Sequence, residues 1–229
     1  MDFTGFEKFS LVDFDDMIGS TLFVSHCNFR CPFCHNGLLV LGQNLPTIKF
    51  DDILKYFKEE NKMIEAVCIS GGEPTLMPDL EEKLIELKKL GLFIKLDTNG
   101  TNPNVIESLH KKGLIDYVAM DIKNSLDNYD TISGIKNVDI SKIKKSINYL
   151  MTSGIEYEFR TTLIKEYHKE EDIIKIANDL KGAKKYYLQK FVDSEYVILH
   201  GLHEVSEDEA NKWKEILSKT IQNVNLRGY

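Results

Sequence analysis

The feature that most constrains the fold is a regular alternation of short apolar segments with longer amphipathic ones. Segments rich in β-branched and aromatic residues predict strands at 20–26, 65–70, 92–97, 117–122, 157–163 and 185–191. Helical patterns begin at about Asp51, Asp79, Pro103, Ser141, Lys169 and Ser206. Because parallel strands need a crossover about as long as a helix, the alternation predicts a parallel α/β sheet.

The number of strand–helix units indicates the architecture. Six units fill 229 residues, whereas a closed eight-unit barrel typically needs about 250. We therefore expect a partial (β/α)6 barrel, which is an open parallel sheet with helices outside. Its core is predicted at about 19–192, with a last helix at about 206–222. No linker, repeat or low-complexity tract marks a second domain, so 1–229 is expected to form one domain.

Composition and charge narrow the class of partner. Hydrophobic residues make up 42% of the chain, enough for a single core, and the net charge of -7 argues against nucleic-acid binding. No apolar run approaches the roughly 20 residues of a membrane helix, and the start "MDFTGFEKF" lacks the features of a signal peptide. We therefore expect a cytoplasmic protein that does not bind membranes and whose partner is a small molecule or another protein.

Three of the four cysteines, Cys27, Cys31 and Cys34, form a CxxxCxxC motif just after the first predicted strand. In a reducing cytoplasm such a cluster indicates metal binding or catalysis before a disulfide. Thiolates suit zinc or iron–sulfur clusters, and three of them on a four-iron cluster would leave one iron open. A structural zinc site with His26 or His35 as fourth ligand is the alternative, but no second cysteine pair with zinc-site spacing follows.

The motif, with Phe33 just before its last cysteine, resembles that of the radical S-adenosylmethionine (SAM) enzymes. The wider phrase "SLVDF...TLFVSHCNFRCPFCHNGLLV" is similar to the glycyl-radical-enzyme activases, most of all those of anaerobic ribonucleoside-triphosphate reductase. The resemblance implies one four-iron four-sulfur cluster on the three cysteines, with SAM on the open iron. It also implies reductive cleavage of SAM to a 5′-deoxyadenosyl radical, which takes hydrogen from a glycine of the reductase. A flavodoxin or ferredoxin is the expected electron donor.

A second motif, "SGGEPT" at 70–75, follows the second predicted strand. In a barrel of parallel strands, functional residues gather at the carboxyl ends of the strands. Gly71 and Gly72 would let the backbone approach a ligand closely, and Glu73 could accept a hydrogen bond from an ammonium group. An ordinary turn is the alternative. Beside the cysteine loop the segment resembles the family's GGE motif, which binds the methionyl amino group.

The next two strand ends carry a polar group each. Asp97, Thr98 and Asn99 end the third predicted strand, and Asp121 and Lys123 end the fourth. Two neighbouring carboxylates are costly unless a cation or donor accompanies them. The resemblance to pyruvate formate-lyase activases implies that the aspartates hold a monovalent cation near the methionyl carboxylate. Capping of the following helix or turn is the alternative.

Arg160 lies inside the fifth predicted strand, an unusual place for a permanently charged side chain. The resemblance implies a contact with SAM. A salt bridge to Asp121 or Glu158 is the alternative.

Three positions bear on how closely the chain follows the activases. Asp13 keeps its place in "SLVD" and is a candidate catalytic residue near the target glycine. Asp15 and Asp16 stand where related activases have a Pro-Gly turn, so the presentation of Asp13 can differ. Lys190 ends the sixth strand near the place where the pyruvate formate-lyase type has a histidine, which argues against that branch.

Other functions are compatible with the motifs. The chain could activate another glycyl-radical enzyme, or act on a small molecule as carboxydeazaguanine synthases do. A noncatalytic metal-binding redox module is the alternative from a different class. Cys68, inside an apolar strand, is expected to pack in the core, and the ending "NLRGY" is expected to be disordered or packed at an edge.

Overall fold

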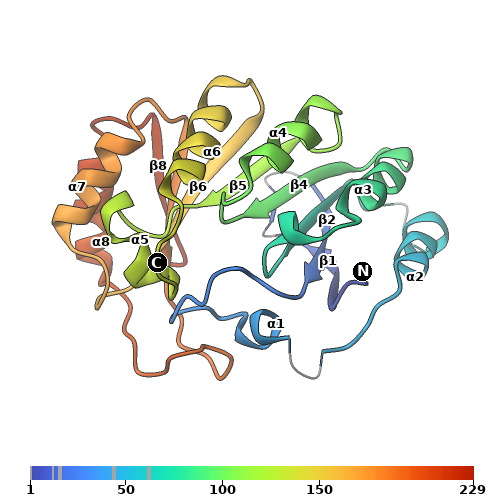
Figure 1. Cartoon of the computed structure of the whole chain (residues 1–229), viewed down its shortest axis with the longest axis horizontal. Helices are drawn as coiled ribbons and strands as arrows, with labels where there is room; N and C mark the ends of the chain where they lie inside the picture. Colours follow the sequence, from blue (N-terminus) through green and yellow to red (C-terminus); the bar gives the residue numbers. More distant parts are fainter. Residues whose placement is uncertain (1, 12, 15–16, 43–44, 61–62) are drawn as a thin grey trace. The chain divides into compact units, whose positions relative to one another are not determined.

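A computed structural model describes residues 2–11, 13–14, 17–42, 45–60 and 63–229 (Figure 1). The fold divides into two compact units, which are described one at a time. The first unit comprises Met1–Asn28, Leu38–Thr98 and Asn102–Val118, and the second comprises Phe29–Gly37, Asn99–Thr101 and Ala119–Tyr229. The single-domain organisation remains a prediction.

The sheet of the first unit contains four strands in sequence order, namely β1 (Gly5–Ser10), β2 (Gly19–Val24), β3 (Ala66–Gly71) and β4 (Phe93–Thr98). The β1–β2 pair is antiparallel, whereas β2–β3 and β3–β4 are parallel. The helices of this unit are α1 (Gly37–Leu41), α2 (Phe50–Lys55), α3 (Leu80–Lys89) and α4 (Pro103–Lys111). A π-helical turn, Tyr56–Glu60, continues α2, and a 3-10 turn, Pro74–Leu76, follows β3.

The second unit contains β6 (Glu156–Leu163), β7 (Lys185–Lys190) and β8 (Asn223–Arg227), joined by parallel pairs in that order. The strand β5 (Tyr117–Asp121) is divided, with its last three residues in this unit. Its helices are α5 (Tyr129–Ser133), α6 (Ile140–Thr152), α7 (Glu170–Asp179) and α8 (Glu207–Leu217). A 3-10 turn, Leu126–Asn128, precedes α5.

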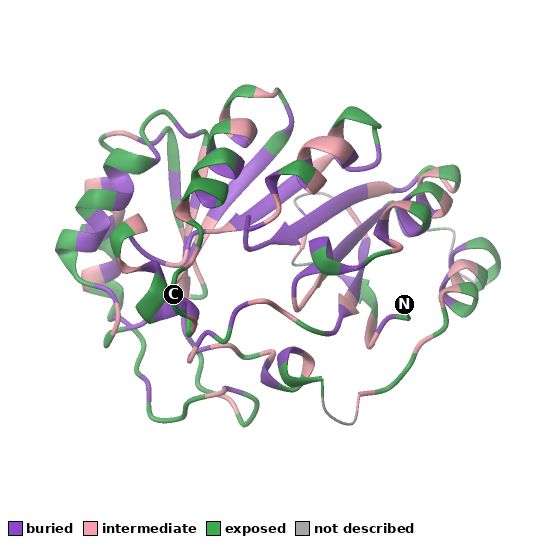
Figure 2. Cartoon of the chain, in the orientation of Figure 1, coloured by how far each residue is buried: buried purple, intermediate pink, exposed green. Residues whose placement is uncertain are grey.

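Strands β2 to β6 are buried along most of their length, whereas the helices alternate buried and exposed residues (Figure 2). In α6, for example, Ile143, Ile147 and Leu150 recur every three or four residues and are buried, as expected for a helix with one face on a sheet. Cys68 is fully buried and packs with Phe14, so its predicted place in the core is confirmed. None of the helices in the described parts of the chain combines the length and apolar character needed to cross a bilayer.

All six predicted strands and all six predicted helices are present, as β2 to β7 and as α2, α3, α4, α6, α7 and α8. The sequence analysis did not predict β1, β8, α1 or α5. The last helix was predicted to reach 222 but ends at Leu217. Tertiary contacts account for this end, because the Thr220 hydroxyl donates to the Ala177 carbonyl of α7 and Ile221 is buried, after which β8 pairs with β7. The ending "NLRGY" thus begins in a paired strand at the edge of the sheet.

Candidate active site

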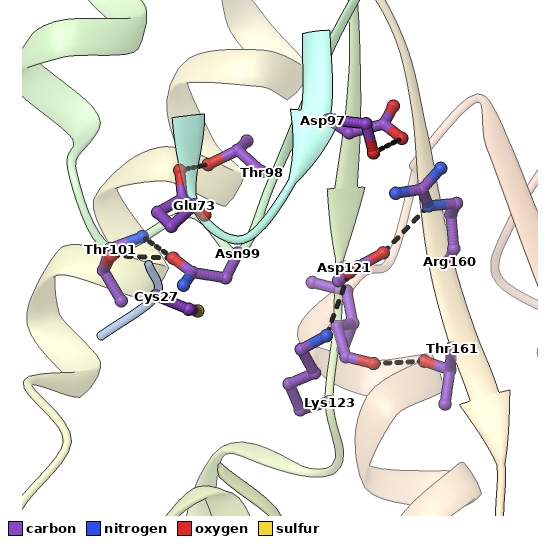
Figure 3. Close-up of polar contacts among 12 residues, drawn as sticks. Cys27, Glu73, Asp97, Thr98, Asn99, Thr101, Asp121, Lys123, Arg160 and Thr161 are labelled. Atoms are coloured by element: carbon purple, nitrogen blue, oxygen red, sulfur yellow. Dashed lines mark hydrogen bonds and ion pairs between the residues drawn. The ribbon is translucent and has the colours of Figure 1, made fainter. Parts of the chain in front are cut away.

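In the first unit, Glu73 lies directly after β3 and its carboxylate is almost completely buried. One oxygen, Oε1, accepts hydrogen bonds from the Thr75 backbone N–H at 3.1 Å, from the Thr75 hydroxyl, and from the Thr98 hydroxyl at 2.8 Å (Figure 3). Glu73 thus caps the 3-10 turn, as the turn alternative expects, and its role toward an ammonium group remains a prediction. These hydrogen bonds fix the orientation of the carboxylate.

Gly71 and Gly72 do allow a close approach, and the atoms that lie close to them are backbone atoms of this chain. A Cβ atom on Gly72 would lie 1.9 Å from the His26 carbonyl oxygen, and one on Gly71 would lie 2.5 Å from that of Val24. The Gly72 and Glu73 N–H groups donate to these carbonyls at 2.9 and 2.8 Å, Gly72 to Val24 and Glu73 to His26. His26 has a φ of 68°, which is uncommon for a residue other than glycine. The Glu73 turn is thus bonded to the segment that leads into Cys27.

Asp97 is the second-to-last residue of β4 in the same unit, and two polar side chains lie near its carboxylate. The Ser70 hydroxyl donates to its Oδ2 at 2.9 Å, and the Lys95 ammonium lies 3.9 Å from its Oδ1. Lys95 is only 3% exposed and donates at 2.7 Å to the backbone carbonyl of Asp13. The sequence analysis missed Lys95, although residues two apart in a strand share a face and Asp97 had been selected.

Asp13 holds the connection between β1 and β2. Its carboxylate accepts hydrogen bonds from the Ser10 hydroxyl at 2.7 Å and from the Thr21 hydroxyl. These contacts account for Asp13 as a turn-stabilising residue, and its role near a target glycine remains a prediction. Asp15 and Asp16 lie outside the described residues.

In the second unit, Asp121 ends β5 between two cations. The Arg160 Nε atom is 2.8 Å from Asp121 Oδ1, and the Lys123 ammonium is 2.9 Å from Oδ2 (Figure 3). Burial alone would raise the pKa of Asp121, but Arg160 and Lys123 outweigh it and hold that pKa far below its ordinary value. Of the partners considered for Arg160, the structure shows Asp121, while Glu158 pairs with Arg227 at 3.3 Å. The three side chains carry a net charge of about +1.

Lys123 is held by residues that the sequence analysis missed. Its backbone N–H donates to the Tyr129 hydroxyl oxygen at 3.2 Å, and its carbonyl lies 2.9 Å from His168 Nε2. Because the Ile164 N–H donates to His168 Nδ1, the ring proton is on Nε2 and donates to Lys123. Burial lowers the pKa of His168, which keeps the ring neutral. His168 follows β6 in a loop, where nothing in the sequence pattern distinguishes it.

The same unit contains Cys31 and Cys34, which are joined by a turn in which the Cys34 N–H donates to the Cys31 carbonyl at 3.0 Å. Phe33 between them is buried, and the Lys123 ammonium lies 5.7 Å from its ring centroid. Burial raises the pKa of the Cys34 thiol, and Lys123 opposes this shift because its positive charge favours the thiolate. A cation therefore accompanies the thiols that the sequence assigns to a metal.

All four cysteines are free thiols. Cys27 belongs to the first unit, and the other two motif cysteines belong to the second. Among the described residues, no three His, Cys, Asp or Glu side chains are grouped closely enough to hold a metal ion as they stand. The arrangement of the three cysteines around one cluster therefore remains a prediction.

Two further selected residues have partners within the chain. Asn99 Oδ1 accepts hydrogen bonds from the N–H and the hydroxyl of Thr101 at 3.0 and 2.7 Å, which is the turn-capping alternative (Figure 3). Thr98 donates to Glu73, as described above.

At the end of β7, Lys190 lies 4.0 Å from Glu204 and 5.8 Å from the ring of Tyr229, which follows β8. The parallel pairing of β8 with β7 thus places Tyr229 near Lys190, which was not predicted from the sequence.

Comparison with known proteins agrees with the motifs. The radical SAM superfamily profile matches residues 21–180. A Methanocaldococcus jannaschii protein with the provisional name of a glycyl-radical enzyme activating enzyme is 35% identical over 241 residues, covering 98% of this chain and 95% of that protein.

Solved structures resemble the chain in fold. A domain of pyruvate-formate lyase-activating enzyme from Bacteroides vulgatus has a TM-score of 0.58 at 19% identity, covering 71% of this chain and 99% of that one. Streptococcus suis SuiB bound to S-adenosylmethionine has a TM-score of 0.69 at 16% identity, covering 91% of this chain and 52% of that one. The fold is thus the α/β fold of radical SAM enzymes, with an open sheet in which parallel pairs dominate.

Proposed function

Because the chain belongs to the radical SAM superfamily and is a radical SAM enzyme, we propose that it activates a glycyl-radical enzyme, namely anaerobic ribonucleoside-triphosphate reductase. The observation that supports activation most strongly is the 35% identity, along almost the whole chain, to a protein named as such an activating enzyme. The reductase as partner rests on the phrase "CPFCHNGLLV" and its surroundings. A flavodoxin or ferredoxin is proposed as the electron donor.

The residues present suit a four-iron four-sulfur cluster on Cys27, Cys31 and Cys34. The thiols are free, soft ligands, and Lys123 lies close enough to Cys34 to favour the thiolate that a cluster requires. When bound and reduced, the cluster would supply the one electron that cleaves the bond from sulfur to C5′ of SAM, and SAM would supply the 5′-deoxyadenosyl group that takes hydrogen from glycine. The chain's part is to bind, orient and shield these groups.

We assign the two ends of the methionyl group of SAM by charge. Glu73, whose carboxylate is oriented by Thr75 and Thr98, suits the amino group, because an ionised carboxylate accepts a charge-assisted hydrogen bond from an ammonium. The group formed by Asp121, Lys123 and Arg160 has an excess positive charge and suits the carboxylate. Phe33, Gly71, Gly72, Asp97, Thr98 and Asn99 are the other residues that we propose for the SAM site.

The decisive test uses the anaerobically reconstituted, reduced protein with SAM and the reductase of the same organism. We expect 5′-deoxyadenosine and a glycyl doublet in the electron paramagnetic resonance spectrum of the reductase. Deoxyadenosine without the doublet would point to another glycyl-radical enzyme or to a small-molecule substrate. If a cluster-loaded protein gave neither deoxyadenosine nor the doublet, that result would contradict the enzymatic function itself.

Cysteine variants test the cluster assignment separately. Cys27→Ala, Cys31→Ala and Cys34→Ala are each expected to lose the cluster absorbance and all activity. Cys68→Ala is the matched control, because Cys68 is a buried free thiol of the core, and it should keep both. A fully active variant of any motif cysteine would contradict the assignment.

A further inference from the structure

The aspartates at the ends of β4 and β5 are the two residues that the resemblance to pyruvate formate-lyase activases assigns to a monovalent cation. An alkali cation binds where several oxygen atoms with surplus negative charge replace its water shell. Whether this chain offers such oxygens can be judged for each aspartate within its own unit.

Both carboxylate oxygens of Asp121 already contact a fixed cation. Arg160 Nε is 2.8 Å from Oδ1 and Lys123 Nζ is 2.9 Å from Oδ2. The side chains of Arg160 and Lys123 are only 12% and 15% exposed, so water screens their charges weakly. One negative and two positive charges give this group a surplus positive charge, which repels a further cation.

Asp97 has a cation of its own on the same strand. Lys95 is two residues earlier in β4, so both side chains lie on one face of the sheet, and the ammonium is 3.9 Å from Asp97 Oδ1. The Lys95 side chain is 4% exposed and is anchored by its 2.7 Å hydrogen bond to the Asp13 carbonyl. The other carboxylate oxygen accepts the Ser70 hydroxyl. Lys95 thus offsets the charge of Asp97 from 3.9 Å, a separation too long for a hydrogen bond.

We propose that this chain replaces the alkali cation with its own side chains, Lys95 at Asp97 and the Lys123–Arg160 pair at Asp121. Lys95 is then a positioning residue, because it joins the end of β4 to the turn that contains Asp13. The inference depends on the proposed function only in that the resemblance to glycyl-radical-enzyme activases suggests an alkali cation. Its test requires neither the cluster nor activity, so the two can fail separately.

The experiment is thermal unfolding of the cluster-free protein in potassium, sodium or tetramethylammonium chloride at equal ionic strength. The wild-type midpoint is expected to agree within about 1 °C in the three salts. A saturable rise of about 3–6 °C in potassium or sodium alone, the size expected for a ligand at about ten times its dissociation constant, would overturn the proposal.

Variants extend the test. Lys95→Met keeps the length of the side chain but removes its charge, and it is expected to create a rise with potassium that the wild type lacks. Lys112→Met is the matched control, since Lys112 forms an exposed ion pair with Glu81 in the same unit, and it should show no such rise. A folded Lys95→Met protein with no potassium response would contradict the role of Lys95. If Lys95→Met does not fold, Lys95→Gln makes the same test with an uncharged polar side chain.

Discussion

Glu73 and Asp121 are carboxylates at the ends of parallel strands, yet their surroundings prepare them for opposite tasks. The named partners of Glu73 are two hydroxyls and one backbone N–H, whereas Asp121 contacts a guanidinium and an ammonium. Neutral donors orient a carboxylate without cancelling its charge, while two cations reverse the charge of the group. The same functional group can thus attract an ammonium at one strand end and an anion at another, and the difference lies entirely in its neighbours.

The largest predicted effect comes from removing the charge of Asp121. Asp121→Asn would leave Lys123 and Arg160 close together without a carboxylate, and we expect a loss of about 3 kcal/mol in the free energy of unfolding. This value is at the lower end for a broken buried pair, because the Asp121 side chain is 30% exposed. Urea unfolding measures it, with Glu81→Gln in an exposed ion pair as a control expected below about 0.5 kcal/mol. Equal losses in the two variants would show that the group is an ordinary surface pair.

Gly72→Ala acts on the Glu73 side of the comparison. The added Cβ would meet the His26 carbonyl, so the turn must move and the bond from the Glu73 N–H to that carbonyl is strained. We expect a loss of about 2 kcal/mol in unfolding free energy and weaker SAM binding. Gly91→Ala is the control, because a Cβ there meets nothing and only the positive φ costs about 1 kcal/mol. An unchanged dissociation constant for SAM in Gly72→Ala would remove this turn from the site.

Thr98→Val sharpens the comparison by removing one neutral donor from Glu73 while keeping the shape of the side chain. A buried carboxylate that loses a hydrogen bond is destabilised, and we expect a loss of about 1 kcal/mol in unfolding free energy. Thr98→Ser keeps the hydroxyl and should lose less. If the two variants were equally destabilised, the methyl group and not the hydrogen bond would account for the effect.

The smallest predicted effect concerns the pH dependence of the free energy of unfolding. It comes from His168, which contacts the carbonyl of Lys123 beside Asp121. Because burial lowers the pKa of His168, the unfolded chain binds the proton more tightly. The resulting stability is complete above the unfolded pKa of about 6.5 and is lost as the pH falls below it toward the folded pKa. Urea unfolding of the cluster-free protein between pH 8 and pH 5.5 measures this loss.

His168→Gln should make that profile less steep. It should not abolish the slope, because burial also lowers the pKa of His35. Asp121 does not interfere, since its pKa lies below the ordinary carboxyl range and it stays charged throughout this window. A profile unchanged in His168→Gln would show that His168 is not held neutral.

Whether the sequence predicted a strand or a helix depended on how strongly that segment is buried and on how long it is. Strands β2 to β7 were predicted because continuous apolar runs such as "AVCISG" mark buried parallel strands. Strand β1, "GFEKFS", is mostly exposed at an edge, and β8, "NVNLR", is short and polar, so neither has that pattern. The five-residue helices α1 and α5 are too short to show a helical period.

The candidate site divides in the same way. The motifs identified the residues at strand ends, such as Glu73 and Asp121, because position along a strand is visible in the sequence. Their partners are set by tertiary contact, as with His168, which reaches Lys123 from a loop 45 residues later. The sequence placed Lys123 at the same strand end as Asp121 and left the partner of Arg160 open. The net charge of the group could be assigned only when the structure showed both cations in contact with Asp121.

The measurement that tests the central comparison most directly is the affinity of the cluster-loaded protein for SAM and for decarboxylated SAM, by equilibrium dialysis. Glu73→Gln should weaken the binding of both ligands by about 10- to 100-fold, because both contain the amino group and a charge-assisted hydrogen bond contributes about 1.5–3 kcal/mol. Lys123→Met should weaken the binding of SAM and leave that of the decarboxylated ligand unchanged. If Lys123→Met weakened both ligands equally, or neither, the assignment of opposite charges to the two strand ends would be contradicted.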